Sequence, residues 1–150
     1  MAFIQLLAPI ISFLGFPIGL FLSFVSPEEM KPGKKYFKLL QNLLLVLILF
    51  FVFDYYLIPL AISILITVAV FLGVFYWQNK YKGIILYTLL AVFLYFSSKN
   101  YSLFALESSL IFMYGFPAGS LIKCRKKDSI KIIAKHAIFI VIAILLLLLF

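Results

Sequence analysis

The chain has 150 residues, of which 66% are hydrophobic and 12% are charged, and its formal net charge is +8. A soluble domain of this size cannot cover so large an apolar fraction, so the composition excludes a water-soluble globule and indicates an integral membrane protein. A single cysteine excludes an intramolecular disulfide and a multi-cysteine metal site. No cofactor is predicted.

Six apolar runs follow one another along the chain, and most of them approach the roughly 20 residues that a membrane-spanning helix needs. We therefore predict an all-α protein with about six transmembrane helices in a single polytopic domain, residues 1–150. The first run is interpreted as a retained span, because the sequence before it lacks the positive segment of a cleaved signal peptide. The fourth run is the shortest and must tilt or borrow flanking residues. The predicted spans are residues 3–24, 36–53, 57–77, 83–96, 101–122 and 130–150.

The segment between the first two spans carries helix-start signals. Ser26 is placed to act as an N-cap, Pro27 stands in the first turn, and Glu29 completes a capping box. Pro32 and Gly33 follow soon after and predict an early stop. The sequence therefore predicts a short helix on the membrane surface, separate from the second span.

The positive charges fall almost entirely in alternate loops, which predicts three hairpins of the form helix, basic loop, helix. Lys99 is the one basic residue on the other side. By the positive-inside rule the basic loops face the cytoplasm and both termini face out, in the plasma or inner membrane. Such loops are expected to contact anionic lipid headgroups and not nucleic acid. The other basic residues are Lys31, Lys34, Lys35, Lys38, Lys80, Lys82, Lys123, Arg125, Lys126, Lys127, Lys131 and Lys135.

A five-residue motif occurs twice, once in the first span and once in the fifth. Residues 15–19 read Gly-Phe-Pro-Ile-Gly and residues 115–119 read Gly-Phe-Pro-Ala-Gly, and both copies lead into a lysine-rich loop. This similarity predicts an internal repeat, in which helices one and two correspond to helices five and six over segments 3–54 and 103–150. An even number of spans separates the two copies, so the repeat is parallel.

One interpretation of this motif is a transport path. A proline inside a span frees a backbone carbonyl, and adjacent glycines let the helix bend or unwind, leaving polar groups that must face a cavity. Breaks at matching positions of two repeats are typical of transport sites. On this view Gly15, Pro17, Gly115 and Pro117 line a path for an ion or small solute.

The other interpretation is helix packing, since a Gly-x-x-x-Gly spacing lets two helices approach closely. The chain is then a non-catalytic structural or assembly subunit of a membrane complex that packs through these faces. The residues with small-x-x-x-small spacing are Gly15, Gly19, Gly115, Gly119, Ala69 and Gly73.

Glu107 is the one acidic residue well inside an apolar run, and Ser108 follows it. An unpaired carboxylate at that depth costs several kcal/mol, so it must be protonated, paired or turned toward water inside the bundle. Ser63 and Thr67 of the third span are candidate hydroxyl partners. These residues predict a proton or small-cation site. The alternative is a fifth span that starts later and leaves Glu107 near the headgroups.

An enzyme is not predicted, because the chain has one histidine, one cysteine and no paired carboxylates at a shared helical spacing. His136 has no second ligand at metal-binding spacing and is placed at the membrane interface. Asp54 stands at a span end beside tyrosines and is expected to stay in water. The leading hypothesis is a small transporter or channel-type subunit that works as a homo-oligomer or with other membrane subunits.

Overall fold

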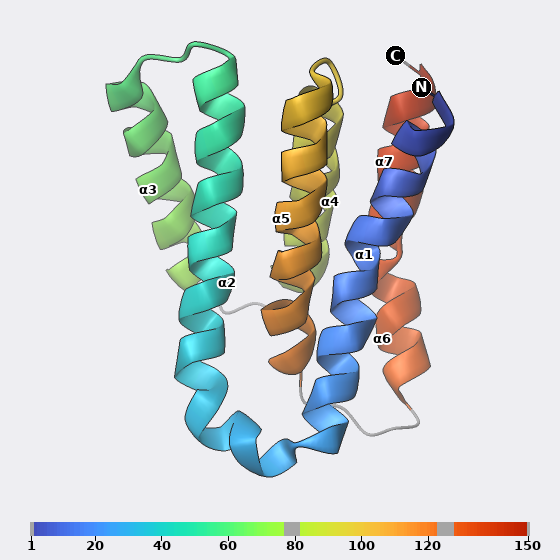
Figure 1. Cartoon of the computed structure of the whole chain (residues 1–150). Helices are drawn as coiled ribbons and strands as arrows, with labels where there is room; N and C mark the ends of the chain where they lie inside the picture. Colours follow the sequence, from blue (N-terminus) through green and yellow to red (C-terminus); the bar gives the residue numbers. More distant parts are fainter. Residues whose placement is uncertain (1, 77–81, 123–127, 150) are drawn as a thin grey trace.

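The computed structural model describes residues 2–76, 82–122 and 128–149, and these residues are helical apart from short turns (Figure 1). The two pieces α6 and α7 meet at Ala137 and together form one rod, so the predicted all-α architecture of six helices is confirmed. The helices are α1 (Ala2–Val25), α2 (Pro27–Tyr55), α3 (Leu60–Tyr76), α4 (Lys82–Ser97), α5 (Tyr101–Ser120), α6 (Ser129–His136) and α7 (Ile138–Leu149).

Part of the predicted basic surface lies outside what the structure describes. This applies to residues 77–81 and 123–127, and to the side chains of Glu29, Lys31 and Lys82. The predicted loop residues Lys80, Lys123, Arg125, Lys126 and Lys127 belong to this group.

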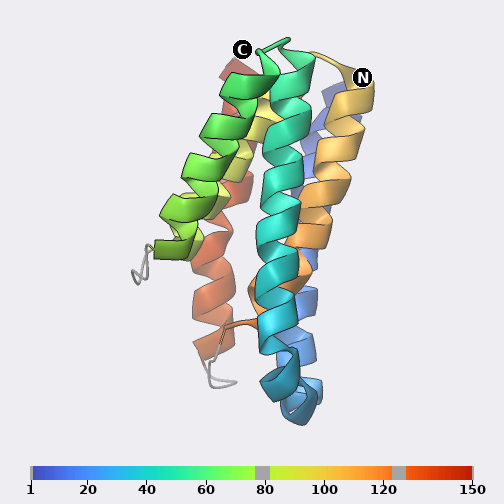
Figure 2. The same ribbon diagram turned by 90° about the vertical axis from the view of Figure 1, so that its left-hand side faces the viewer.

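Successive helices run in opposite directions along the bundle, so α1 and α5 run in the same direction (Figure 1). These two lie side by side and form the most extensive helix pair of the described chain. The α5 helix also packs against α2 and α4, and α7 packs against α4 and α1. The α3 helix lies at the edge, where it packs chiefly against α2 (Figure 2).

Three helical stretches of the described chain are long and apolar enough to cross a membrane: Gln5–Val25, Pro32–Tyr55 and Ser129–Leu149. Two shorter apolar stretches accompany them, Leu60–Val70 and Gly83–Ser97. The lengths and composition of these helices support the predicted membrane location.

The α5 helix is not among the three stretches that are long and apolar enough to cross a membrane, although it is central in the bundle. Its 20 residues include Glu107 and several serines, which lower its hydropathy. Nine of its residues are buried against other helices. Its charged residue Glu107 faces protein instead of lipid, which makes this polar residue tolerable in the bundle.

The predicted short surface helix is wrong, because α2 runs without interruption from Pro27 through Pro32 and Gly33 to Tyr55. Pro32 removes one backbone hydrogen bond, whose acceptor is the carbonyl of residue 28 near the start of the helix, and Glu28 is exposed to solvent. Figure 1 shows the first turns of α2 running across the end of the bundle before the helix turns along it, as a proline kink allows. Ser26 occupies the N-cap position, but its side chain makes no capping bond.

An aromatic cluster forms the centre of the core. Phe13 stacks on Phe139 with ring centroids 6.4 Å apart, and Phe16 meets Tyr87 edge-on at 5.4 Å. Leu90 of α4 is also fully buried. These side chains come from α1, α4 and α7, so the cluster joins the first, fourth and last helices of the chain.

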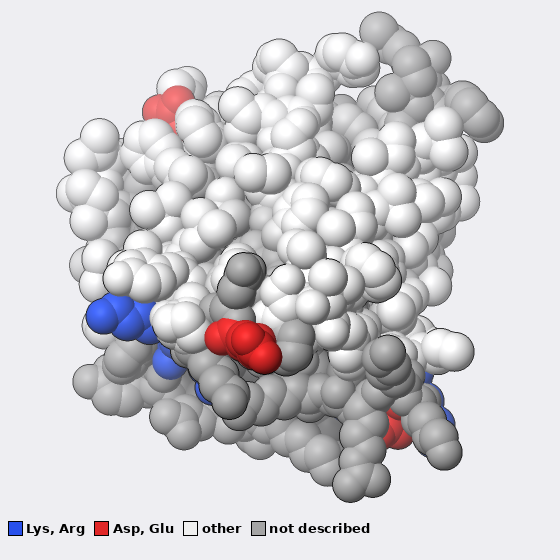
Figure 3. All heavy atoms as spheres, turned by 60° about the horizontal axis from the view of Figure 1, so that its bottom comes forward, with Lys and Arg blue, Asp and Glu red and all other residues white. Residues whose placement is uncertain are grey.

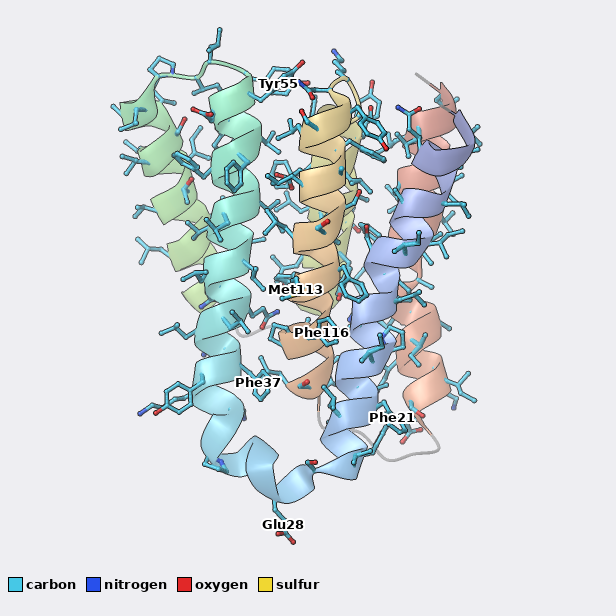
Figure 4. The ribbon with its side chains drawn as sticks, viewed as in Figure 1. Phe21, Glu28, Phe37, Tyr55, Met113 and Phe116 are labelled. Carbon is cyan, nitrogen blue, oxygen red and sulfur yellow. The ribbon has the colours of Figure 1, made fainter. Side chains whose placement is uncertain are left out.

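The two ends of the bundle differ in charge. The described residues Lys34, Lys35 and Lys38 stand in the first half of α2, and Figure 4 places Glu28 at the same end and Tyr55 at the opposite end. In Figure 3, which turns this end forward, the visible lysine atoms lie around it. We call it the basic end.

The fold generates a topology prediction, because exposed Lys35 and exposed Lys99 belong to opposite ends of the bundle. Single cysteines at these positions, in a Cys124→Ser background, should react with a membrane-impermeant maleimide from opposite sides. With the basic end in the cytoplasm, Lys99→Cys reacts in intact cells and Lys35→Cys reacts only after permeabilisation. Labelling of both positions in intact cells would contradict this arrangement.

Candidate functional site

The two copies of the glycine motif pack directly against each other. A Cβ atom at Gly115 would lie 2.5 Å from the amide nitrogen of Phe16 and 2.6 Å from the carbonyl carbon of Gly15. A Cβ atom at Gly119 would lie 2.6 Å from the amide nitrogen of Leu20. Such distances leave room for hydrogen only, so α1 and α5 are in backbone contact. We call this contact, formed by Gly15, Gly19, Gly115 and Gly119, the glycine seam.

The glycine seam contains no open path in the described chain. Both α1 and α5 continue as α-helices through Pro17 and Pro117, so the predicted broken helices are not found. The Ser120 hydroxyl lies 3.0 Å from the carbonyl oxygen of Gly19 and 2.8 Å from that of Phe116, and so bridges the two helices. The contact is close and hydrogen-bonded, as expected of packing through small residues.

The third predicted packing pair behaves differently. A Cβ atom at Gly73 would meet nothing within 4 Å, and Ala69 is exposed. The face of α3 that carries these residues therefore points away from the described bundle. Among the described residues Ala69 and Gly73 form no close helix contact, and their packing against another subunit stays a prediction.

A cavity of about 290 Å³ opens at the basic end between α2, α4, α5 and α6. We call it the basic-end cavity. Its polar lining comes mainly from α2, where Lys34, Lys38 and Gln41 follow one another at helical spacing on one face. The described residues that line it are Phe16, Lys34, Lys38, Gln41, Asn42, Gly83, Leu86, Tyr87, Tyr114, Ala118, Leu121, Ile122 and His136.

Two tyrosines and a glutamine stand at the inner end of this cavity. The Gln41 side-chain amide donates a hydrogen bond of 2.9 Å to the Tyr114 hydroxyl. The Tyr87 ring lies 5.9 Å from the Tyr114 ring, and the Tyr87 hydroxyl has no hydrogen-bond partner among the described residues. The cavity thus reaches a polar cluster inside the bundle.

His136 is buried in the wall of the basic-end cavity, and this burial was not predicted from the sequence. Its ring stacks on Phe16 at 4.6 Å and meets Tyr87 edge-on at 5.5 Å. Its Nδ1 donates to the carbonyl oxygen of Ile132 at 2.8 Å, because that oxygen can only accept. Gly83 makes room for the ring, since a Cβ atom there would lie 2.5 Å from Nε2.

A second pocket, of about 250 Å³, lies at the opposite end of the bundle between α2 and α5. We call it the far-end pocket. Asp54 lines it and is exposed, as predicted. Asn100 also lines it, and its side chain caps α5 by accepting hydrogen bonds from the amides of Ser102 and Leu103.

Glu107 is fully buried, with 0% of its surface exposed, and neither carboxyl oxygen has a hydrogen-bond partner in the described chain. Its carboxyl group is therefore enclosed by protein, and its depth in the membrane stays a prediction. The predicted hydroxyl partners do not reach it: Ser63 bonds at 3.4 Å to the carbonyl of Ile58, and α3 packs chiefly against α2. Thr67 is buried on the same helix as Ser63.

Two neighbouring rows of residues along α5, which we call stripes, have different contacts. Ser108, Phe112, Gly115 and Gly119 recur at helical spacing, and the last three contact α1 across the glycine seam. The Ser108 hydroxyl is buried without a partner. The predicted residues Glu107 and Ser108 are thus adjacent in sequence but lie on different stripes.

The second stripe joins the two hollows. It runs through Leu103, Glu107, Ile111, Tyr114 and Ala118 at the i, i+3 and i+4 spacings of one helix face. Leu103 lines the far-end pocket, and Tyr114 and Ala118 line the basic-end cavity. Glu107 therefore stands between the two hollows on the face that connects them.

Comparison with protein-family models, with curated proteins and with solved structures finds no match for this chain.

Sequence reasoning missed the cavity residues Gln41, Tyr87, Tyr114 and His136 as a group. A signal for one of them was present, since Gln41 and Asn42 form an amide pair inside an apolar run. The tyrosines gave no signal, because tyrosine is common in membrane helices at interfaces as well as in cores. Only the packing of α2, α4, α5 and α6 brings these side chains together.

The glycine seam predicts a contrast between two Gly→Ala substitutions. Gly115→Ala places a methyl group against the backbone of α1 and should destabilise the protein by about 1–3 kcal/mol. Gly73→Ala meets open space and should be neutral or stabilising by up to about 1 kcal/mol, because alanine favours helix. Thermal unfolding of the two purified variants in detergent measures the difference. Equal midpoints would show that the close backbone contact is absent.

Proposed function

We propose that this protein is a small transport-type membrane subunit that moves protons along the interior of the bundle, with Glu107 as the group that carries them. The observation that supports this most is the buried, unpartnered carboxyl of Glu107 on the stripe between two hollows at opposite ends. An ionisable residue inside a membrane bundle marks a functional site by default.

The separation between the two hollows is short. On α5, Leu106 lines the far-end pocket and Tyr114 lines the basic-end cavity. These residues are about 12 Å apart along the helix axis, from a rise of about 1.5 Å per residue. Glu107 lies inside this interval, next to Leu106, and is the only carboxyl group between these two described residues.

A proton suits the site better than a metal cation. Hard cations require several oxygen ligands, about six to eight for Ca²⁺, whereas a proton needs one carboxyl oxygen. The described chain holds no group of three or more His, Cys, Asp or Glu side chains that could bind a metal ion. Both Glu107 oxygens also lack a partner there.

The path we propose differs from the one that the repeated motif suggested. Pro17 and Pro117 lie in continuous helices, and Gly15 and Gly115 are in backbone contact. The seam therefore serves to hold α5 in place, while the neighbouring stripe of α5 carries the proton. The Gly-x-x-x-Gly faces of α1 and α5 are already used inside the chain, so an assembly subunit would have to pack through the open face of α3 at Ala69 and Gly73.

The proposal predicts that the purified protein lets protons into vesicles and that Glu107→Gln does not. Vesicles loaded with a pH-sensitive dye and potassium are treated with valinomycin, so that potassium efflux draws protons inward. Glutamine keeps the shape of the side chain but has no exchangeable carboxyl proton, so the initial rate should fall to that of empty vesicles while the unfolding temperature stays near the parent value.

Glu28→Gln is the matched control, because it removes a carboxyl group from an exposed position at the basic end. Its rate should equal that of the parent. A Glu107→Gln protein that is folded and conducts protons normally would remove Glu107 from the path. A parent protein no faster than empty vesicles would refute proton movement by this chain alone.

A further inference from the structure

The basic-end cavity presents hydrogen-bond donors and positive charge to whatever enters it. Lys34 and Lys38 are exposed at its mouth, one helical turn apart on α2. Gln41 continues the same face inward by about another turn, and Asn42 beside it adds a second amide. The α2 helix therefore supplies hydrogen-bond donors along the cavity, with charged donors at the mouth and a neutral amide further inside.

The opposite wall is aromatic. The His136 ring is held between Phe16, stacked at 4.6 Å, and Tyr87, edge-on at 5.5 Å. Its Nδ1 is committed to the Ile132 carbonyl, so Nε2 is the nitrogen left for other contacts.

Among the described lining residues there is no carboxylate. A cavity with two lysines and no acid has a positive potential that attracts anionic ligands. Lysine is also a common phosphate ligand, as a point charge on a flexible stem. The position of the cavity at a helix-bundle end, where the lysines of membrane proteins meet anionic headgroups, fits the same chemistry.

The rest of the lining is apolar. Leu86, Leu121 and Ile122 close the cavity together with the Phe16 ring. A bare, fully hydrated anion gains nothing from these side chains, whereas an anion attached to an apolar group buries that group against them. The lining is therefore suited to a ligand with one charged and one apolar part.

We infer that the basic-end cavity is a binding site for a phosphate ester with an apolar substituent, held by Lys34 and Lys38 at the mouth and by Gln41 within. Glu107 does not line this cavity, so the binding site is independent of whether the chain moves protons. Two sources provide such a ligand: the headgroup of a membrane lipid and a soluble alkyl phosphate.

The test is thermal unfolding of the purified protein in a zwitterionic detergent, titrated with three probes. Phosphatidic acid represents the lipid source, hexyl phosphate represents the soluble source, and inorganic phosphate lacks the apolar part. A ligand that binds only the folded state raises the unfolding temperature in a saturable way. We expect phosphatidic acid or hexyl phosphate to do so at concentrations well below those of inorganic phosphate, and the stronger of the two identifies the source.

Charge variants distinguish binding in the cavity from non-specific attraction of an anionic ligand to the basic end. Lys34→Gln and Lys38→Gln should each weaken binding about fivefold, from a contribution of about 1 kcal/mol per lysine. Lys35→Gln removes the same charge from the neighbouring position, which is exposed and does not line the cavity. Its affinity should stay within twofold of the parent value.

A third variant tests the interior without changing charge. Gln41→Leu removes the amide that reaches Tyr114 and should also weaken binding, although the mouth keeps both lysines. The inference is overturned if none of the three probes stabilises the parent, if inorganic phosphate binds as tightly as the esters, or if Lys35→Gln weakens binding as much as Lys34→Gln. An unchanged affinity in Gln41→Leu would likewise place the ligand outside the cavity.

Discussion

The backbone contact between α1 and α5 is the constraint on which the rest of the bundle depends. Gly15 and Gly115 remove the side chains that would keep the two helices apart, and the Ser120 hydroxyl joins their backbones. Because one face of α5 is fixed against α1, its neighbouring face turns toward α2 and α4. That face carries Glu107 and Tyr114, so the glycines decide where the polar groups of the bundle lie.

Polar groups inside a membrane bundle are stable only when a neighbour or water satisfies them. In the described chain some buried polar groups have a hydrogen-bond partner and others have none. Gln41 and Tyr114 bond to each other, and His136 bonds to its own helix. Glu107 and the Tyr87 hydroxyl have no partner in the described chain. Such unsatisfied groups lower stability, and in membrane proteins they are concentrated where a substrate, a proton or a ligand passes.

Local sequence rules predicted the helices well and their contacts poorly. Apolar runs and alternating lysine loops gave six helices and the two unlike ends, because length and charge are properties of single segments. Pro32 was wrongly predicted to end the helix. A proline near a helix start costs little when the carbonyl that loses its hydrogen bond can bind water instead. The burial of His136 and the open face at Gly73 were not predicted, because the side of a helix that faces the core depends on partners distant in sequence.

The position of α3 has a further consequence for how the protein responds to its bilayer. The described part of this helix, Leu60–Tyr76, has 17 residues, or about 26 Å at 1.5 Å per residue, close to the roughly 30 Å of a typical hydrocarbon core. Because it packs chiefly against α2, few contacts hold its depth and tilt. Hydrophobic mismatch therefore acts on α3 before it acts on the helices around the glycine seam. Membrane thickness is expected to set the angle of α3 and to leave the stripe of α5 unchanged.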